Sequence, residues 1–170
     1  MFEGWSDFHL LLGTAAGALI GLLFVVARLN PGVERAKLAR GQSTYMTPNV
    51  FDLAVVLVVS AVALTPRLPA AMAGATVSLC ALGGLAHGVA VCLRLHRLRA
   101  QASAPHWSDF WLYGAAAAAI HLGLIASGAL IAAGEAPAAY GLAASALLLM
   151  LLAIRNAWDL VTTIAQNARG

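Results

Sequence analysis

The chain has 170 residues, of which 61% are hydrophobic and only 10% are charged. Soluble domains carry about 25% charged residues, so this composition excludes an ordinary water-soluble domain and indicates an integral membrane protein. The formal net charge of +3 could suit a nucleic-acid partner, but the basic residues lie in short segments beside apolar stretches. That arrangement is typical of a membrane topology signal, and we expect no nucleic-acid partner.

Five long apolar stretches follow one another and predict an all-α fold, a bundle of five transmembrane helices in a single domain covering residues 1–170. A helix rises about 1.5 Å per residue, so about 20 apolar residues cross a hydrocarbon core of about 30 Å. Four stretches reach or nearly reach this length, and the second is short enough to need Pro48, Asn49 and Phe51 at one interface. The predicted spans are about 8–29, 50–65, 70–93, 110–133 and 138–154.

The distribution of Lys and Arg predicts the orientation of these spans. Nine of the ten basic residues lie after the first span, after the third span or in the tail, and only Arg67 lies on the opposite side. Because short cytoplasmic segments carry an excess of Lys and Arg, we expect the N-terminus outside and the C-terminus in the cytoplasm. No basic residue precedes the first span, so this span is expected to remain as an anchor rather than to be cleaved as a signal peptide.

The first span carries the most specific motif in the chain, a glycine zipper with a spacing of four residues at Gly13, Gly17 and Gly21. Lipid gives helices no hydrophobic reason to associate, so small residues on one face favour close backbone contact and dispersion packing. The motif fits two interpretations. One is tight helix packing within a subunit, and the other is self-association into a homo-oligomer around a pore.

Two histidines lie at membrane depth, His87 in the third span and His121 in the fourth. Each follows small residues on the same helical face, so both imidazoles are expected to point at other helices rather than at lipid. Counting the rise per residue from Arg94 and Trp107 separates the two by about 10 Å along the axis, which argues against one shared metal ion or haem iron. Two roles stay open, an interhelical hydrogen bond and a group on a proton or ion pathway.

A polar set gathers at the predicted inner interface, on the second, fourth and fifth spans. Two of its members, Arg155 and Asp159, are four residues apart and can pair along one helical face. The set fits the cytoplasmic mouth of a conduit or a docking site for a partner; alternatively, its members only reach water and fix the helix ends. The members are Asp52, Asp109, Arg155, Asn156 and Asp159.

No motif predicts catalysis or a bound cofactor. The chain has no Ser/His/Asp constellation, H-E-x-x-H, P-loop or Gly-rich nucleotide fingerprint, and the predicted external loops are too short for a folded active site. Cys80 and Cys92 lie twelve residues apart on one predicted helix, about 18 Å along its axis, so they cannot bridge each other. We therefore expect no enzyme activity, no cofactor, no catalytic residue and no metal site.

Two segments carry a likeness to other proteins. One is Trp5–Asn30, with Phe8, Gly13 and the run G-L-L-F-V-V-A-R-L-N from Gly21, and the other is R-N-A-W-D-L at Arg155–Leu160. Together they resemble a group of small bacterial polytopic inner-membrane proteins of unassigned function. The resemblance implies a multi-pass protein of the bacterial inner (cytoplasmic) membrane and no particular activity.

The leading functional hypothesis is a channel or a small-solute or ion transporter, assembled as a homo-oligomer in the lipid bilayer. In it, His87 and His121 are polar groups on the path, and the inner-interface set lines its cytoplasmic mouth. The alternative is a non-catalytic accessory or scaffold subunit whose basic inner loops and tail engage a membrane-protein partner. A third hypothesis, a redox protein with haem between histidines of different subunits, predicts visible absorbance of the pure protein.

Overall fold

The computed structural model describes residues 2, 4–29, 47–99 and 110–167, and this part of the chain consists of helices joined by turns, without a strand. The predicted all-α class is therefore confirmed for the described residues. The elements in chain order are α1 (Ser6–Leu29), α3 (Thr47–Leu64), α4 (Ala70–Arg99), the π-helix η2 (Phe110–Ala115), α6 (Ala116–Ala132) and α7 (Ala138–Asn167).

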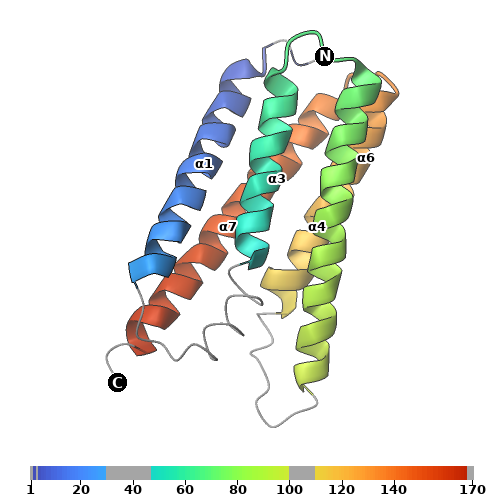
Figure 1. The fold of residues 1–170 in the computed structure, drawn as a ribbon. Coiled ribbons are helices and arrows are strands. Elements are labelled where there is room, and N and C mark those ends of the chain that lie inside the picture. The colour runs from blue at the N-terminus through green and yellow to red at the C-terminus, as the bar shows by residue number, and fades with distance from the viewer. Residues whose placement is uncertain (1, 3, 30–46, 100–109, 168–170) are drawn as a thin grey trace.

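The helices run alternately down and up, so each is antiparallel to the one before it (Figure 1). α1, α4 and α7 descend from the end of the bundle where the chain begins, whereas α3 and α6 return to that end. The start of α1 and the end of α7 therefore lie at opposite ends of the bundle (Figure 1). The turns after α3 and after α6 lie at the same end as the start of α1, which we call the N-terminal end.

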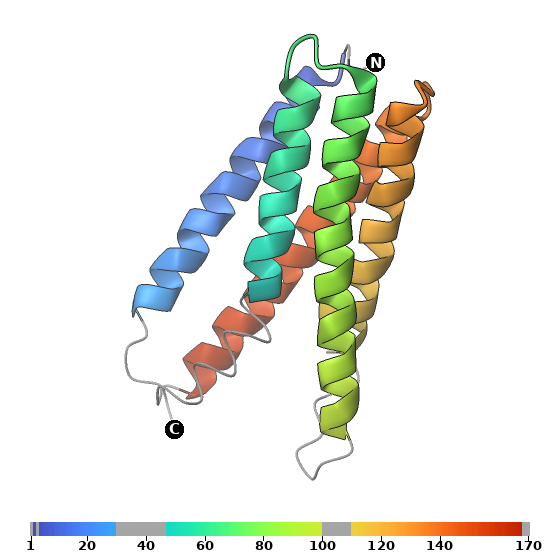
Figure 2. The same ribbon diagram turned by 45° about the vertical axis from the view of Figure 1, so that its right-hand side comes forward.

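α7 crosses the back of the bundle obliquely, as Figure 2 shows. Its N-terminal half packs beside α6, and its C-terminal half continues past α3 toward the end of α1. At the N-terminal end, the ring of Trp5 meets the ring of Tyr140 edge-on, with centroids 5.0 Å apart. This contact ties the start of α1 to the start of α7 by an aromatic geometry that is favourable between rings.

Local backbone chemistry fixes the turn between α6 and α7. Gly134 has a φ of 80°, the left-handed conformation that commonly ends helices. The amide of Gly134 donates to the carbonyl of Ile131 at 2.9 Å. The amide of Glu135 donates to the carbonyl of Leu130 at 3.0 Å, which completes a Schellman motif. The helix therefore stops where glycine supplies the required φ.

The bundle is apolar on its outside and partly polar in its interior. Large apolar side chains on the outer faces are strongly exposed, for example Leu11 at 68%, Leu79 at 72% and Trp158 at 71%. The described polar residues that are buried are His9, Asn49, Asp52, Ser60, His121, Ser127 and Asn156. Soluble monomers rarely expose large continuous apolar surfaces, and in them charged residues are mostly exposed. This distribution is that of a membrane protein.

Three described segments are long and apolar enough to cross a membrane, by length and composition: Ser6–Val26, Ala70–His96 and Ala138–Asp159. Two further apolar helical segments, Asn49–Leu64 and Ala116–Ala132, are shorter. The π-helix η2 runs directly into α6 and lengthens that helical segment at its start.

Two helices extend well beyond the apolar stretches from which they were predicted. α4 and α7 have 30 residues each and continue past Leu93 and Ile154, where the predicted spans end. At about 1.5 Å per residue each helix is about 45 Å long, more than the thickness of a hydrocarbon core. Hydropathy marks where a segment leaves the apolar region, but Arg, Leu and Ala are good helix formers and continue the helix after that point.

The most extensive helix contact in the described structure is between α4 and α6, and glycines permit it. A Cβ on Gly74 of α4 would overlap the carbonyl oxygen of Gly128 on α6. A Cβ on Gly128 would in turn lie 2.9 Å from the carbonyl oxygen of Gly74. Further along the pair, a Cβ on Gly88 would lie 3.3 Å from the backbone nitrogen of Ala118. Small residues thus bring the two backbones together, as is typical of membrane helices.

Candidate functional site

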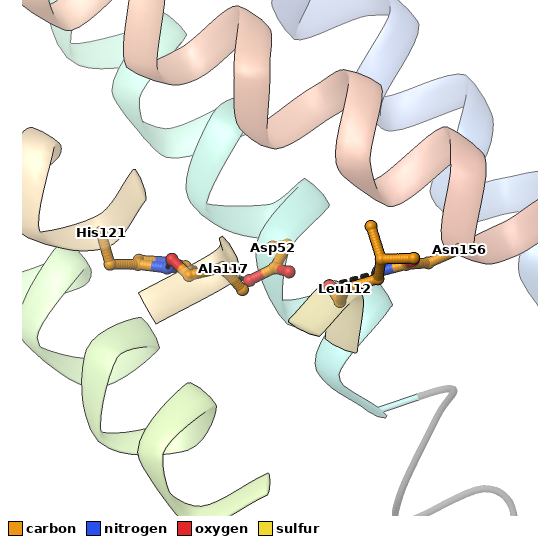
Figure 3. A network of polar contacts seen from close by, with 5 residues as sticks. All are labelled: Asp52, Leu112, Ala117, His121 and Asn156. Carbon is orange, nitrogen blue, oxygen red and sulfur yellow. Dashed lines mark hydrogen bonds and ion pairs between the residues drawn. The ribbon is translucent and has the colours of Figure 1, made fainter. Parts of the chain in front are cut away.

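A buried acid and a buried histidine from different helices meet in the interior. Asp52 and His121 both lie in the second turn of their helices, α3 and α6. The Nε2 atom of His121 is 3.7 Å from an Oδ1 of Asp52, and the side chains are 0% and 7% exposed (Figure 3). Charges taken out of water carry a large desolvation cost, and ionisable residues inside membranes often mark transport pathways. This pair is therefore the candidate functional site.

The His121 ring is oriented by its own helix and by a glycine on α4. Its Nδ1 atom lies 2.8 Å from the carbonyl oxygen of Ala117, one turn earlier (Figure 3). A Cβ on Gly84 would overlap the atoms of the imidazole ring, so the ring lies against bare backbone. Together these contacts direct Nε2 of His121 toward α3.

The hydrogen-bond roles of His121 follow from its partner. A backbone carbonyl only accepts, so the Nδ1 of His121 carries the hydrogen in this contact. In the neutral ring, Nε2 is then an acceptor without a hydrogen-bond donor. It faces the carboxylate of Asp52, which is also an acceptor when ionised, across 3.7 Å. The two atoms attract each other only when a proton or a cation lies between or on them.

His87 lies one turn from Gly84 on α4, on the side toward the end of α4. Its ring stacks on Phe51 of α3, with centroids 5.8 Å apart and planes 17° apart, and its Nε2 is buried without a hydrogen-bond partner. Since Gly84 is level with the His121 ring, the two histidines are offset by three residues, or about 5 Å along the axis. The sequence estimate of about 10 Å was too large, because α4 continues beyond Arg94 and that residue does not mark the helix end.

The inner-interface set is only partly brought together. Asn156 of α7 is buried and donates its Nδ2 to the carbonyl oxygen of Leu112 in η2 at 3.3 Å, and Figure 3 shows Asp52 between this contact and His121. Arg155 is exposed and donates to the Oδ1 of Asn156 at 3.2 Å. Asp159 lies one turn further along α7, and its carbonyl accepts a hydrogen bond from the hydroxyl of Thr162 at 3.0 Å. Asp109 lies outside the described residues.

The three glycines of the first span lie in different surroundings. Gly13 is buried against α3, where a Cβ would lie 3.1 Å from the Cβ of Ser60. A Cβ on Gly17 or on Gly21 would meet no described atom within 4 Å. The structure therefore brings Gly13 into a helix contact and leaves Gly17 and Gly21 on an open face of α1.

Three further polar side chains are buried in the structure, and of these the sequence had placed only Asn49, at a membrane interface. Their polar atoms have no hydrogen-bond partner; these atoms are both ring nitrogens of His9, both polar atoms of the Asn49 amide and the hydroxyl of Ser60. One signal could have identified His9: it lies four residues before Gly13 and so shares the face of the glycine series. Nothing in the sequence indicated that Ser60 of α3 would lie opposite this face.

No three His, Cys, Asp or Glu side chains of the described segments gather in a way that could hold a metal ion. The described site is thus a pair, Asp52 and His121, with His87 one turn away. Comparison of this chain with protein-family models, with curated proteins and with solved structures found no match.

Proposed function

We propose that this protein is a membrane transport protein in which the His121–Asp52 pair binds a proton or a small cation during transfer across the bilayer. One observation carries the proposal: two buried acceptor atoms face each other across 3.7 Å, with the nitrogen oriented by the Ala117 carbonyl. Such a pair is stable when it holds a positive charge and repulsive when it does not. Binding and release of that charge is the elementary step of a proton or ion relay.

The proposal includes five crossings of a bacterial inner membrane, with the N-terminal end of the bundle outside. The helical lengths support it, since the 18 residues of α3 rise about 27 Å and η2 adds six residues to the 17 of α6. The charges support it too. Arg28, Arg94 and Arg155 belong to the C-terminal halves of α1, α4 and α7, whereas Arg67 belongs to the turn between α3 and α4 at the N-terminal end; cytoplasmic segments carry such an excess of basic residues.

The functional unit in this proposal is a homo-oligomer. α1 lies at the side of the bundle, and its open face at Gly17 and Gly21 is available for close contact with a second copy (Figure 1). The mass of the purified protein in mild detergent tests this part: a discrete multiple of the 17.5 kDa chain is expected, and a monomer contradicts it.

Flux into liposomes tests the function itself. Vesicles containing the pure protein and a trapped pH dye are exposed to an acid step, and then to gradients of Na⁺ and K⁺ with a fixed membrane potential. We expect uptake by the wild type and its loss in Asp52→Asn and His121→Gln, which keep size but cannot hold the charge. The matched controls are Asp7→Asn and His96→Gln, whose side chains are exposed and which should transport normally. Inert wild-type vesicles under all conditions, or full activity of both site variants, would overturn the proposal.

A second candidate function is that of an accessory subunit, and one observation favours it. An apolar groove of about 350 Å³ lies between α1 and the C-terminal half of α7, with Leu22 and the strongly exposed Trp158 among its lining residues. Apolar side chains of a partner membrane protein would fit into it. Mild detergent extraction tests this candidate, since it requires a stable partner that is lost in Trp158→Ala, together with wild-type vesicles that show no flux.

A further inference from the structure

A second polar site lies near the N-terminal end of the bundle, between α1 and α3 and away from the His121–Asp52 pair. His9 of α1 and Ser60 of α3 are both 0% exposed, and none of their side-chain polar atoms has a hydrogen-bond partner. Both line one groove of about 260 Å³. Buried donors and acceptors are almost always satisfied, so these groups require a partner that the described part of the chain does not supply.

The lining of the groove indicates the chemistry of that partner. Its polar groups are the His9 ring and the hydroxyls of Thr14 and Ser60, all of which can donate and accept hydrogen bonds. Its other side chains are apolar, and no Asp, Glu, Lys or Arg lines it. A neutral hydroxyl or carbonyl head therefore fits better than an ion. The lining includes three exposed leucines, Leu10, Leu57 and Leu64, which would contact an apolar chain.

The size of the groove fits one hydrocarbon chain of a small ligand and not a helix of another protein. A helix with its side chains is about 10–12 Å wide, which a groove of about 260 Å³ cannot hold. His9, Gly13, Gly17 and Gly21 follow at a spacing of four residues, so they lie along one face of α1. Because Gly17 and Gly21 meet no described atom within 4 Å, this face of α1 is open beyond the groove.

We propose that the groove between α1 and α3 binds the head of a neutral single-chain amphiphile with a hydroxyl or carbonyl group. His9 and Ser60 hydrogen-bond the head, and the chain lies along the open glycine face of α1. The ligand enters sideways from the hydrocarbon region. The inference goes beyond the proposed transport function and does not depend on flux.

Photolabelling tests this inference. The probe is hexadecanol with a diazirine in its chain, added to the wild-type protein in liposomes without any gradient, and labelled residues are identified by mass spectrometry. We expect labels on α1 and α3 that excess hexadecanol suppresses and excess hexadecane does not. His9→Phe and Ser60→Ala should each reduce labelling about threefold to tenfold, the effect of one lost hydrogen bond.

Ser127→Ala is the matched control, because this buried hydroxyl already donates to the Gly123 carbonyl of its own helix at 2.8 Å and does not line the groove. It should label like the wild type. Equal competition by hexadecane, or labels spread evenly over all helices, would show that only lipid chains cover the groove and would overturn the proposal. The competition between hexadecanol and hexadecane in the wild-type protein tests the proposal even if His9→Phe does not fold. Because labelling uses no gradient, a negative labelling result is independent of a negative flux result.

Discussion

The α4–α6 contact and the glycine face of α1 are built from the same residue type, yet only the first is closed. On α4, α6 and the adjoining π-helix η2, glycines at positions 74, 84, 88, 114 and 128 each lie against an atom of the facing helix. On α1, Gly13 contacts Ser60, while Gly17 and Gly21 meet nothing described within 4 Å. The glycine series of α1, with its regular spacing of four residues, is therefore the more open of the two. The glycines of the α4–α6 contact, which are irregularly spaced, are the more tightly packed.

This difference shows what a small-residue pattern reports. It marks a helix face on which a close approach costs little, but the approach occurs only where another helix is held at the right position. α4 and α6 are held together along most of their length, whereas α1 packs mainly on α3 and contacts α7 less extensively. Replacing a glycine by alanine on each of these faces tests how closed its surroundings are.

The largest loss of stability is expected for Gly74→Ala and Gly128→Ala. Each added Cβ meets backbone of the facing helix, which cannot move without separating α4 from α6. Overpacking of this kind costs about 1–3 kcal/mol. Thermal unfolding of the detergent-solubilised protein measures it, and because both changes strain one contact, the double variant should lose less than the sum of the two. Unchanged melting of both single variants would refute the close approach.

Gly84→Ala should have the next largest effect and should act on the site. The new Cβ overlaps the His121 ring, which can turn away, so the stability loss is smaller than for Gly74→Ala, but Nε2 then no longer faces Asp52. We expect reduced flux in the liposome assay with a folded protein. The control is Gly83→Ala, whose Cβ would lie 3.3 Å from the end of the Phe51 side chain and should leave flux unchanged. Equal flux in the two variants would argue against the position assigned to His121.

Gly114→Ala should cause a moderate loss of stability that a second substitution, at Cys92, restores. Its Cβ would overlap the sulfur of Cys92, while the nearest backbone atom of Cys92 is 3.4 Å away. Removing the sulfur in the double variant Gly114→Ala/Cys92→Ala should therefore recover most of the lost stability. A melting temperature of the double variant no higher than that of Gly114→Ala would show that the strain is in the backbone.

The smallest effect is expected for Gly17→Ala and Gly21→Ala in the single subunit. With no described atom near either Cβ, the substitution should gain about 1 kcal/mol at most, the difference in helix propensity between the residues. Size-exclusion chromatography with light scattering then separates the two interpretations of the glycine series. A smaller oligomer would support self-association through α1, whereas an unchanged mass would exclude this face from the interface.

Much of the fold follows from local properties of the chain. Apolar length and the positions of Pro and Gly are read within one segment, so the helices and the antiparallel turns between them could be predicted. The ends of α4 and α7 could not be predicted from hydropathy, because a helix continues in water when its residues favour helix formation. The described helices otherwise cover the apolar stretches of the sequence.

The site could be predicted only as separate residues. His87, His121 and Asp52 were recognised because ionisable groups are rare in apolar helices. Asp52 was grouped with Arg155 and Asp159, which are polar residues at a similar depth, whereas in the structure its carboxylate faces His121. His9 was not identified from the sequence, although it lies four residues before Gly13 and so on the face of the glycine series.

The sequence by itself determined that the chain forms apolar helices with polar residues among them, because solvent preference and helix formation are local. Only the tertiary structure decided which polar groups meet. That choice depends on the depth and rotation of each helix against its neighbours, and these are set by contacts such as Gly84 against the His121 ring and Gly74 against Gly128. Contacts of this kind join residues far apart in the chain, and spacing rules within one helix cannot predict them.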